Sequence, residues 1–156
     1  MTKAIVFDMD GTLADFYGVQ GWLENLQDKN PRPYIIAEPL VDISTFNFLI
    51  EMLKEYGYKI IITTWLSKDS TQDFDNLVRV AKKDWLNRYG INYDEIHLVK
   101  YGTTKANCTR NKADYQILFD DNQKIRNGWT LGEAYDVQNI EKILTDILFE
   151  EIKKKA

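Results

Sequence analysis

The stretch Lys3-Ala4-Ile5-Val6-Phe7-Asp8-Met9-Asp10-Gly11 decides the expected fold of this chain. Lys3–Phe7 is a short, mostly apolar run with β-branched residues, and it stops abruptly at Asp8. Gly11 follows where the chain has to turn. This pattern is typical of a buried strand that ends in a tight turn. We therefore predict a strand over Lys3–Phe7 and polar side chains at its carboxyl end.

Strands and helices are expected to alternate along the rest of the chain. Short apolar runs predict further strands at Lys59–Thr63, Glu95–Val99, Gln116–Phe119 and Glu133–Val137. Helical spacing of apolar residues predicts helices at Val19–Asp28, Thr45–Tyr56, Thr71–Tyr89, Asn122–Trp129 and Asn139–Lys153. Such alternation indicates a parallel sheet that helices cover on both faces. The predicted fold class is α/β, with a Rossmann-like three-layer arrangement.

Local signals indicate where several of these elements begin and end. Ser44 is the expected N-cap of the helix over Thr45–Tyr56, and Gly57 is its expected stop. The prolines and the asparagine of Lys29–Pro33 predict a loop. Thr64 is expected to begin the loop that follows the second strand.

The length of 156 residues is that of one ordinary domain. No internal repeat, low-complexity tract or change in composition suggests a boundary, so we predict a single catalytic domain over residues 1–156. The segment at about residues 15–42 is aromatic and contains prolines, and it is too small for a domain of its own. We expect it to form a flap, a minimal cap over the site.

Composition narrows the classes of function. The formal net charge of −4 gives no basic surface for tight, non-specific binding of nucleic acid. The apolar runs are too short to cross a bilayer, and Asp8 and Asp10 interrupt the apolar N-terminus, so we expect neither a membrane span nor a secretory signal. Cys108 is the only cysteine and can form no internal disulfide. We therefore expect a cytoplasmic protein.

Polar side chains gather at the predicted carboxyl ends of the strands. Asp8 and Asp10 follow the first strand, Thr64 follows the second, and Asp120 and Asp121 follow the fourth. Open α/β sheets bind ligands at this edge, so these residues should converge on one pocket. Carboxylates that meet there need a cation, and Mg²⁺ is the hard cation that such oxygen ligands suit.

Four motifs in order closely resemble those of the haloacid dehalogenase superfamily of phosphohydrolases. Phe7–Asp15 (FDMDGTLAD) is similar to the specific first motif of that superfamily. Ile60–Thr64 resembles the second motif, Lys105 the lysine of the third, and Leu118–Asp121 the acidic fourth. The resemblance spans roughly Lys3–Val137. It implies a haloacid dehalogenase-like fold and a magnesium-dependent phosphomonoesterase.

The resemblance also implies roles for the carboxylates. Asp8 would be the nucleophile that forms an aspartyl-phosphate, and Asp10 would protonate the leaving oxygen and later deprotonate water. Mg²⁺ would be held by Asp8, by the backbone carbonyl of Asp10, and by at least one of Asp120 and Asp121. The resemblance does not decide which member of that last pair binds the metal directly.

Thr64 and Lys105 would bind phosphoryl oxygens and offset charge that develops in the transition state. The lysine of the third motif is open to a second assignment, because Lys112 also precedes Asp120. The loop formed by Gly102, Thr103 and Thr104 favours Lys105, but spacing alone leaves both lysines open.

At the level of groups, the sequence most resembles the 5′(3′)-deoxyribonucleotidases, which implies a small phosphorylated substrate such as a (deoxy)nucleoside monophosphate. A nucleobase needs rings on which to stack, and the candidates are Phe16, Tyr17, Trp22, Tyr34 and Trp65. Arg32 could meet a second phosphate or the edge of the base. Trp22 and Tyr34 could equally well pack the flap onto the body.

Three other functions compete with this reading. A polynucleotide 3′-phosphatase would accept a phosphorylated nucleic-acid end, and a sugar-phosphate phosphatase would need no base. From another class, a receiver-like or non-catalytic module would bind phosphate without turnover. Receiver domains place the acidic pair first and the phosphorylated aspartate later, whereas here Asp8 and Asp10 come first and Asp120 and Asp121 come late.

Overall fold

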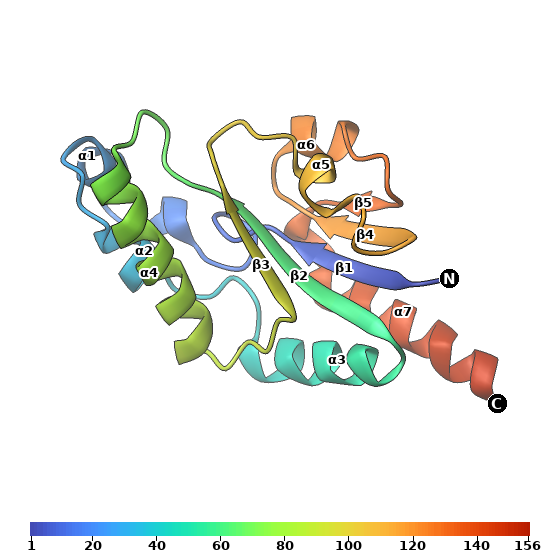
Figure 1. The fold of residues 1–156 in the computed structure, drawn as a ribbon. Helices are drawn as coiled ribbons and strands as arrows, with labels where there is room; N and C mark the ends of the chain where they lie inside the picture. The colour runs from blue at the N-terminus through green and yellow to red at the C-terminus, as the bar shows by residue number, and fades with distance from the viewer.

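The computed structural model describes residues 1–156 and contains one five-stranded sheet in which every pairing is parallel (Figure 1). The strand order is β3-β2-β1-β4-β5. The strands are β1 (Lys3–Phe7), β2 (Tyr58–Trp65), β3 (Glu95–Val99), β4 (Tyr115–Phe119) and β5 (Ala134–Tyr135). The predicted parallel α/β sheet is confirmed.

Helices cover both faces of this sheet. The helices are α1 (Trp22–Gln27), α2 (Arg32–Ile36), α3 (Ile43–Glu55), α4 (Gln72–Arg88), α5 (Lys105–Thr109), α6 (Gln123–Asn127) and α7 (Ile140–Lys155), and the 3₁₀ turns are η1 (Phe16–Gly18) and η2 (Val137–Asn139). In Figure 1, α3 and α7 lie on one side of the strands, and α5 and α6 lie on the other. The expected three layers are present. None of the helices combines the length and hydrophobicity that crossing a membrane requires.

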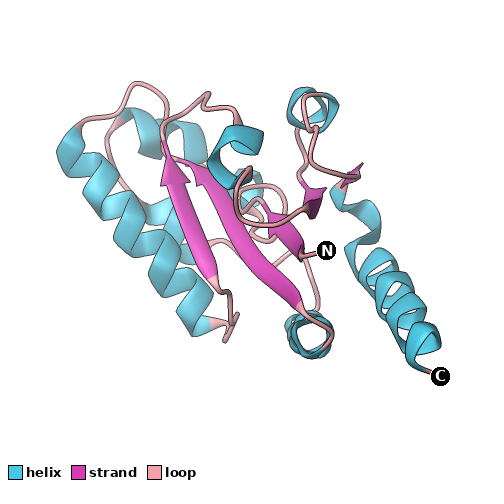
Figure 2. Cartoon of the chain, turned by 45° about the vertical axis from the view of Figure 1, so that its right-hand side comes forward, coloured by secondary structure: helices cyan, strands magenta, loops and turns pink.

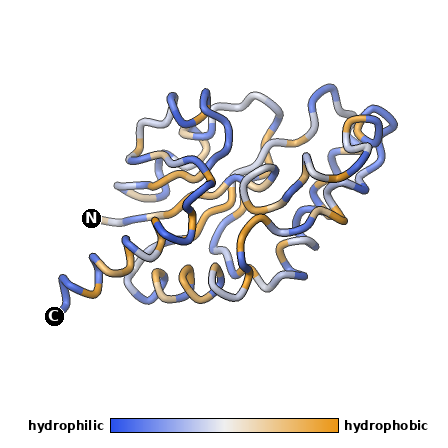
Figure 3. The backbone as a smooth tube through the Cα atoms, turned by 180° about the vertical axis from the view of Figure 1, so that it is seen from behind, coloured by the Kyte–Doolittle hydropathy of each residue, from blue (hydrophilic) through white to orange (hydrophobic).

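The alternation of side chains along β1 explains the two covered faces. Ile5 and Phe7 belong to a cluster of 22 buried residues that includes side chains of α3, α4 and α7. Ala4 and Val6 point the other way, into a smaller cluster with Ala106 of α5. Because successive residues of a strand face opposite sides, one apolar run can serve both cores. Figure 3 shows the matching pattern in α7, which alternates between hydrophobic and hydrophilic stretches.

The register of the central strands places the candidate residues side by side. Phe7 pairs with Ile62 of β2 and with Phe119 of β4, so these three strands reach the same edge together. The strand arrows point the same way in Figure 2. The strands β2 and β3 lie on one side of β1, and β4 and β5 lie on the other. The strand order therefore reverses between β1 and β4. Ligand sites of open α/β sheets lie at such a point.

Residues 15–42, which we call the flap, lie between β1 and α3 and carry η1, α1 and α2. Phe16 and Tyr34 of the flap pack with Phe74 and Val78 of α4 in a buried cluster. This contact holds the flap against the body beside the edge at which β1 ends.

Two expectations about the first half of the chain were wrong. Residues 29–33 were expected to form only a loop, but α2 begins at Arg32. Pro33 lies in its first turn, where a missing N–H removes no intrahelical hydrogen bond. The N-cap of α3 is Asp42 and not Ser44, because the Asp42 carboxylate accepts the Thr45 N–H at 2.9 Å.

Two further differences concern segments at the candidate site. The strand β2 extends through Thr64 to Trp65, so Thr64 lies within the strand and does not begin a loop. Its pairing with Leu98 of β3 accounts for the added length. The short helix α5 was not expected, and it begins at Lys105.

Candidate active site

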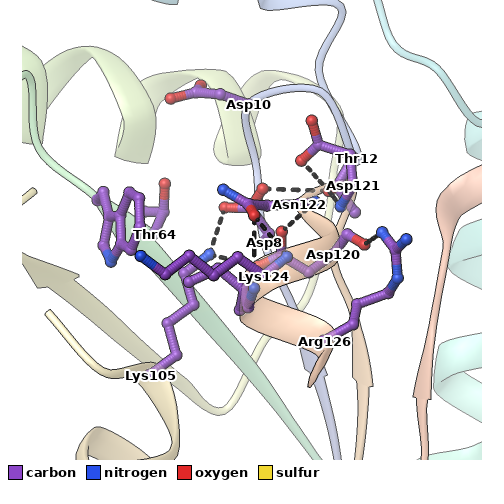
Figure 4. Close-up of polar contacts among 12 residues, drawn as sticks. Asp8, Asp10, Thr12, Thr64, Lys105, Asp120, Asp121, Asn122, Lys124 and Arg126 are labelled. Atoms are coloured by element: carbon purple, nitrogen blue, oxygen red, sulfur yellow. Dashed lines mark hydrogen bonds and ion pairs between the residues drawn. The ribbon is translucent and has the colours of Figure 1, made fainter. Parts of the chain in front are cut away.

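Three carboxylates meet where β1 and β4 end. Asp8 follows β1, and Asp120 and Asp121 follow β4. One oxygen from each lies within 4.8 Å of the others. Figure 4 shows the three side chains together. Asp8 and Asp120 are buried, whereas Asp121 is exposed. The structure therefore brings Asp8 and Asp120 together, although they are 112 positions apart in the sequence.

A buried ammonium joins two of these carboxylates. Lys105 Nζ donates to Asp8 Oδ1 at 2.9 Å and to Asp120 Oδ2 at 2.6 Å. The Lys105 side chain is only 3% exposed. Burial opposes its charge, but the charges of Asp8 and Asp120 outweigh burial and raise the pKa of Lys105. The ammonium therefore stays charged and offsets part of the carboxylate repulsion.

The two carboxylates that follow β4 have raised pKa values. Burial, followed by the charge of Asp8, raises the pKa of Asp120 to about 6 and that of Asp121 to about 7. Both values lie above the ordinary pKa of an aspartate. Without a cation, the cluster therefore holds protons near neutral pH.

Thr12 and Gly11 allow the turn after β1 to lie close to this cluster. Thr12 Oγ1 lies 3.1 Å from Asp8 Oδ2 and 3.4 Å from Asp121 Oδ1, so its hydroxyl links the ends of β1 and β4. Gly11 has a φ of +79°, and a Cβ there would collide with the Asp121 carboxylate. Glycine is therefore needed both for its backbone conformation and for the close approach of Asp121.

The loop after β4 is held from its other side. Arg126 Nη1 donates to the backbone oxygen of Asp120 at 2.9 Å and lies 3.6 Å from Asp136 Oδ1. The Asn122 N–H donates to Asp120 Oδ1 at 2.9 Å. Both oxygens of the Asp120 carboxylate are thus bound within the protein, one by Asn122 and one by Lys105.

Asp10 stands apart from this network. Its carboxylate points away from the cluster in Figure 4 and is 18% exposed. Asp10 Oδ2 accepts a hydrogen bond from Lys82 Nζ at 2.9 Å. Burial raises the pKa of Asp10, against the opposing charge of Lys82. A carboxylate beside the cluster that can hold a proton is suited to acid–base chemistry.

Thr64 is fully buried, and its Oγ1 accepts a hydrogen bond from Lys82 Nζ at 2.6 Å. The side chain does not line the cavity described below. Its hydroxyl proton remains available for donation, because a hydroxyl can accept and donate at once. The neighbouring Thr63 is also buried, but its Oγ1 has no partner.

The donor set fits a hard divalent cation. The carboxylates of Asp8, Asp120 and Asp121 supply clustered oxygens. The backbone carbonyl of Asp10 accepts no hydrogen bond from the protein and is a further free oxygen donor. Oxygen-rich sites of this kind suit Mg²⁺. The set includes no nitrogen or sulfur ligand that would favour zinc.

A cavity of about 320 Å³ opens between the flap and these carboxylates. Asp8, Asp10 and Lys105 line it on the side of the sheet. Its aromatic lining consists of Phe16, Tyr17, Trp22, Tyr34, Trp65 and Tyr101. Arg32, which was expected to contact substrate, is exposed on α2 and does not line this cavity.

Trp65 lines this cavity and also a second one of about 440 Å³, which has Thr103 and Lys124 in its wall. Trp65 packs on Tyr101 with ring centroids 4.9 Å apart, and its Nε1 donates to the Thr103 carbonyl at 2.9 Å. The Lys105 ammonium lies 5.5 Å from the centre of the Trp65 ring. The ring is thus fixed beside the buried lysine.

The structure separates the two lysines that the sequence left open. Lys105 contacts the carboxylates, whereas Lys112 is partly exposed and pairs with Glu95 of β3 at 3.2 Å. Sequence reasoning missed Lys82, although its spacing held a signal. Lys82 falls on the stripe of α4 that includes Phe74 and Val78, where an apolar residue is expected.

No protein-family model matches this sequence, and no curated protein matches it. Among solved structures, the chain is similar to the crystal structure of D,D-heptose 1,7-bisphosphate phosphatase from Burkholderia thailandensis. The TM-score is 0.58 at 14% sequence identity, over 94% of this chain and 99% of that chain. The fold is therefore a haloacid dehalogenase-like Rossmann fold. At this identity the likeness shows the fold alone.

We expect Asp121→Asn to stabilise the metal-free protein at neutral pH. Because the pKa of Asp121 is raised to about 7, folding favours its protonated form, and stability is lost as the pH rises from about 4 to about 7. Asparagine removes this loss. With the exposure of Asp121 discounted, we expect a gain of roughly 1 kcal/mol at pH 8, or about 3 °C in Tm.

Thermal unfolding in a chelator at pH 4.5 and pH 8 measures this gain. The control is Asp84→Asn, which changes an exposed carboxylate on α4. An Asp121→Asn protein that is no more stable than wild type at pH 8 would contradict a raised pKa of Asp121 in the folded protein.

Proposed function

We propose that this chain is a magnesium-dependent phosphomonoesterase of the haloacid dehalogenase superfamily that forms a transient phosphoryl-aspartate on Asp8. The observation that carries the proposal is the buried Lys105 ammonium between Asp8 and Asp120, with Asp121 beside them at the carboxyl edge of the sheet. The resemblance of the motifs around these residues points the same way.

Two displacements complete the proposed reaction. In the first, an Asp8 oxygen forms a bond to phosphorus as the bond to the leaving oxygen breaks, and Asp10 gives that oxygen a proton. In the second, a water oxygen attacks the same phosphorus, Asp10 takes a proton from the water, and the acyl phosphate bond breaks. Asp8 returns as a carboxylate, and inorganic phosphate is released.

The groups around Asp8 would stabilise the negative charge of the transferring phosphoryl group. Lys105 offsets negative charge on the transferring phosphoryl group. Thr64 does not line the cavity, and its hydroxyl reaches the site only through its hydrogen bond with Lys82. Asp8, the Asp10 carbonyl and at least one of Asp120 and Asp121 would hold Mg²⁺, which would neutralise further phosphoryl charge when bound.

The proposed substrate is a (deoxy)nucleoside monophosphate, as for the 5′(3′)-deoxyribonucleotidases. The aromatic lining of the flap cavity supports this choice, because a base can stack on rings such as Tyr17 and Trp65, whereas Phe16 is largely buried. A sugar phosphate is the second candidate, since the structurally similar protein is named for a heptose bisphosphate. A 3′-phosphorylated nucleic-acid end is the third.

We expect phosphate release from 5′- or 3′-(deoxy)nucleotides with Mg²⁺ and none with a chelator. The panel also contains sugar phosphates and a 3′-phosphorylated oligonucleotide. Asp8→Asn should abolish release while the far-ultraviolet circular dichroism spectrum and Tm remain near those of wild type, because the nucleophile is lost without a change in shape. An active Asp8→Asn protein would refute the covalent route. A wild-type protein inactive on the whole panel would favour a phosphate-binding module.

Lys105→Met should lower kcat by about 100-fold or more, because an ammonium aimed at developing charge is lost. Lys112→Met is the matched control, since Lys112 pairs with Glu95 away from the cluster, and its kcat should stay within about twofold of wild type. Steady-state kinetics on the best substrate measures both. A larger loss in Lys112→Met would move the phosphate-binding role to that residue.

Trp65→Ala should lower kcat/KM for deoxyadenosine 5′-monophosphate about tenfold more than for 2-deoxyribose 5-phosphate, because only the nucleotide has a base to stack. The two substrates share the leaving oxygen, so their ratio isolates the contact with the base. Phe48→Ala removes an exposed aromatic ring on α3 and should leave the ratio unchanged. Equal losses for both substrates in Trp65→Ala would argue against stacking on this ring.

A further inference from the structure

Lys82 is a second buried lysine beside the carboxylates, and the reaction proposed above assigns it no role. Its side chain is 1% exposed and comes from α4. Lysine is rarely buried unless its charge is paired. Here each ammonium proton has one acceptor: Asp10 Oδ2 at 2.9 Å, Thr64 Oγ1 at 2.6 Å and the Trp65 carbonyl at 2.9 Å. The ammonium is therefore held in one place.

Stability alone gives little reason for a lysine at this position. Its neighbours on the same stripe of α4, Phe74 and Val78, are apolar and buried. Replacing a buried ion pair by packed apolar residues is often neutral or stabilising. The pairing with Asp10 thus calls for another explanation.

Lys82 is also the only residue that holds the Asp10 carboxylate. No other side chain or backbone group forms a hydrogen bond with that carboxylate. Lys82 binds Oδ2 and leaves Oδ1 without a protein partner. Asp10 lines the flap cavity, whereas Lys82 does not. Lys82 can therefore orient Asp10 but has no access to a bound substrate.

We propose that Lys82 is a positioning residue that holds Asp10 Oδ2 so that Oδ1 faces the leaving oxygen of the substrate. The inference rests on the proposed phosphatase function. Two fixed anchors, Thr64 and the Trp65 carbonyl at the end of β2, connect the ammonium to the sheet. The ring of Tyr34 closes the flap side at 5.1 Å from Nζ. Lys105 thus donates a hydrogen bond to Asp8, and Lys82 donates one to Asp10.

The test uses Lys82→Met and a series of phosphate monoesters from p-nitrophenyl phosphate to an alkyl phosphate. The kcat/KM reports the steps up to departure of the leaving group, in which Asp10 acts as the acid. We expect a loss of about 100-fold for the alkyl ester and less than about fivefold for the p-nitrophenyl ester, whose leaving group departs without a proton. Lys83→Met, an exposed neighbour on α4, is the control and should match wild type.

The slope of log kcat/KM against the pKa of the leaving group is the readout that a merely structural role would not move. A uniform loss along the series at unchanged Tm would overturn the inference. No loss at all would also overturn it, since Asp10 would then keep its place without Lys82.

A double variant covers the case in which Lys82→Met alone leaves Asp10 unpaired and fails to fold. Asp10→Asn/Lys82→Met removes both charges and is compared with Asp10→Asn. Since Lys82 acts through Asp10, we expect the two proteins to agree within about twofold in kcat/KM for p-nitrophenyl phosphate. A further loss of about tenfold or more would show an independent role and refute the inference.

The same series separates failure of this inference from failure of the proposed function. A wild-type protein inactive on every ester with Mg²⁺ present would refute the phosphatase function, and the role of Lys82 would fall with it. An active wild-type protein with a uniform loss in Lys82→Met would refute the role of Lys82 alone.

Discussion

The repulsion among carboxylates at one edge of the sheet is the constraint on which the rest of the site depends. Parallel pairing of β1 with β4, in a register that aligns Phe7 with Phe119, forces Asp8 and Asp120 together. Buried carboxylates carry a desolvation cost of several kcal/mol each unless other charges compensate them. Lys105, which is itself buried, offsets part of this cost. It lies at the start of α5 and donates hydrogen bonds to both carboxylates. The arrangement is therefore fixed by charge as well as by strand pairing.

Counting formal charges shows what the fold leaves uncompensated. Four carboxylates (Asp8, Asp10, Asp120 and Asp121) face two ammonium groups (Lys82 and Lys105), which leaves a formal charge of −2 when all are ionised. Burial is the main cause of the raised pKa values of Asp120 and Asp121, and the negative charge of Asp8 raises them further. A divalent cation would balance the formal charge and would bring the oxygen-binding chemistry that the donor set suits. The two lysines and the proposed Mg²⁺ thus complement one another.

The fold was largely predictable from local patterns, since an apolar run ending at Asp8 and alternating strands and helices leave few other arrangements. The clustering of Asp8, Asp120 and Asp121 was predictable too, because the carboxyl ends of parallel strands share an edge. For Lys82 the sequence held only the signal of a lysine on an apolar stripe of α4, and its contact with Asp10 depends on which face α4 turns toward the sheet. The mistaken expectations at Arg32 and Thr64 have a similar origin. Packing of α2 on α4 and pairing of β2 with β3 decide the local structure there, and no short-range signal encodes either contact.

The helix α4 links the flap to the candidate acid–base residue. Phe74, Val78 and Lys82 follow one another at a spacing of four residues, so they lie along one side of the helix. The first two pack against Phe16 and Tyr34 of the flap, and the third reaches Asp10. The rings that shape the cavity and the carboxylate proposed to protonate the leaving oxygen are therefore positioned by the same rigid element. A change in flap packing that shifts α4 would move the cavity lining and the Asp10 carboxylate together.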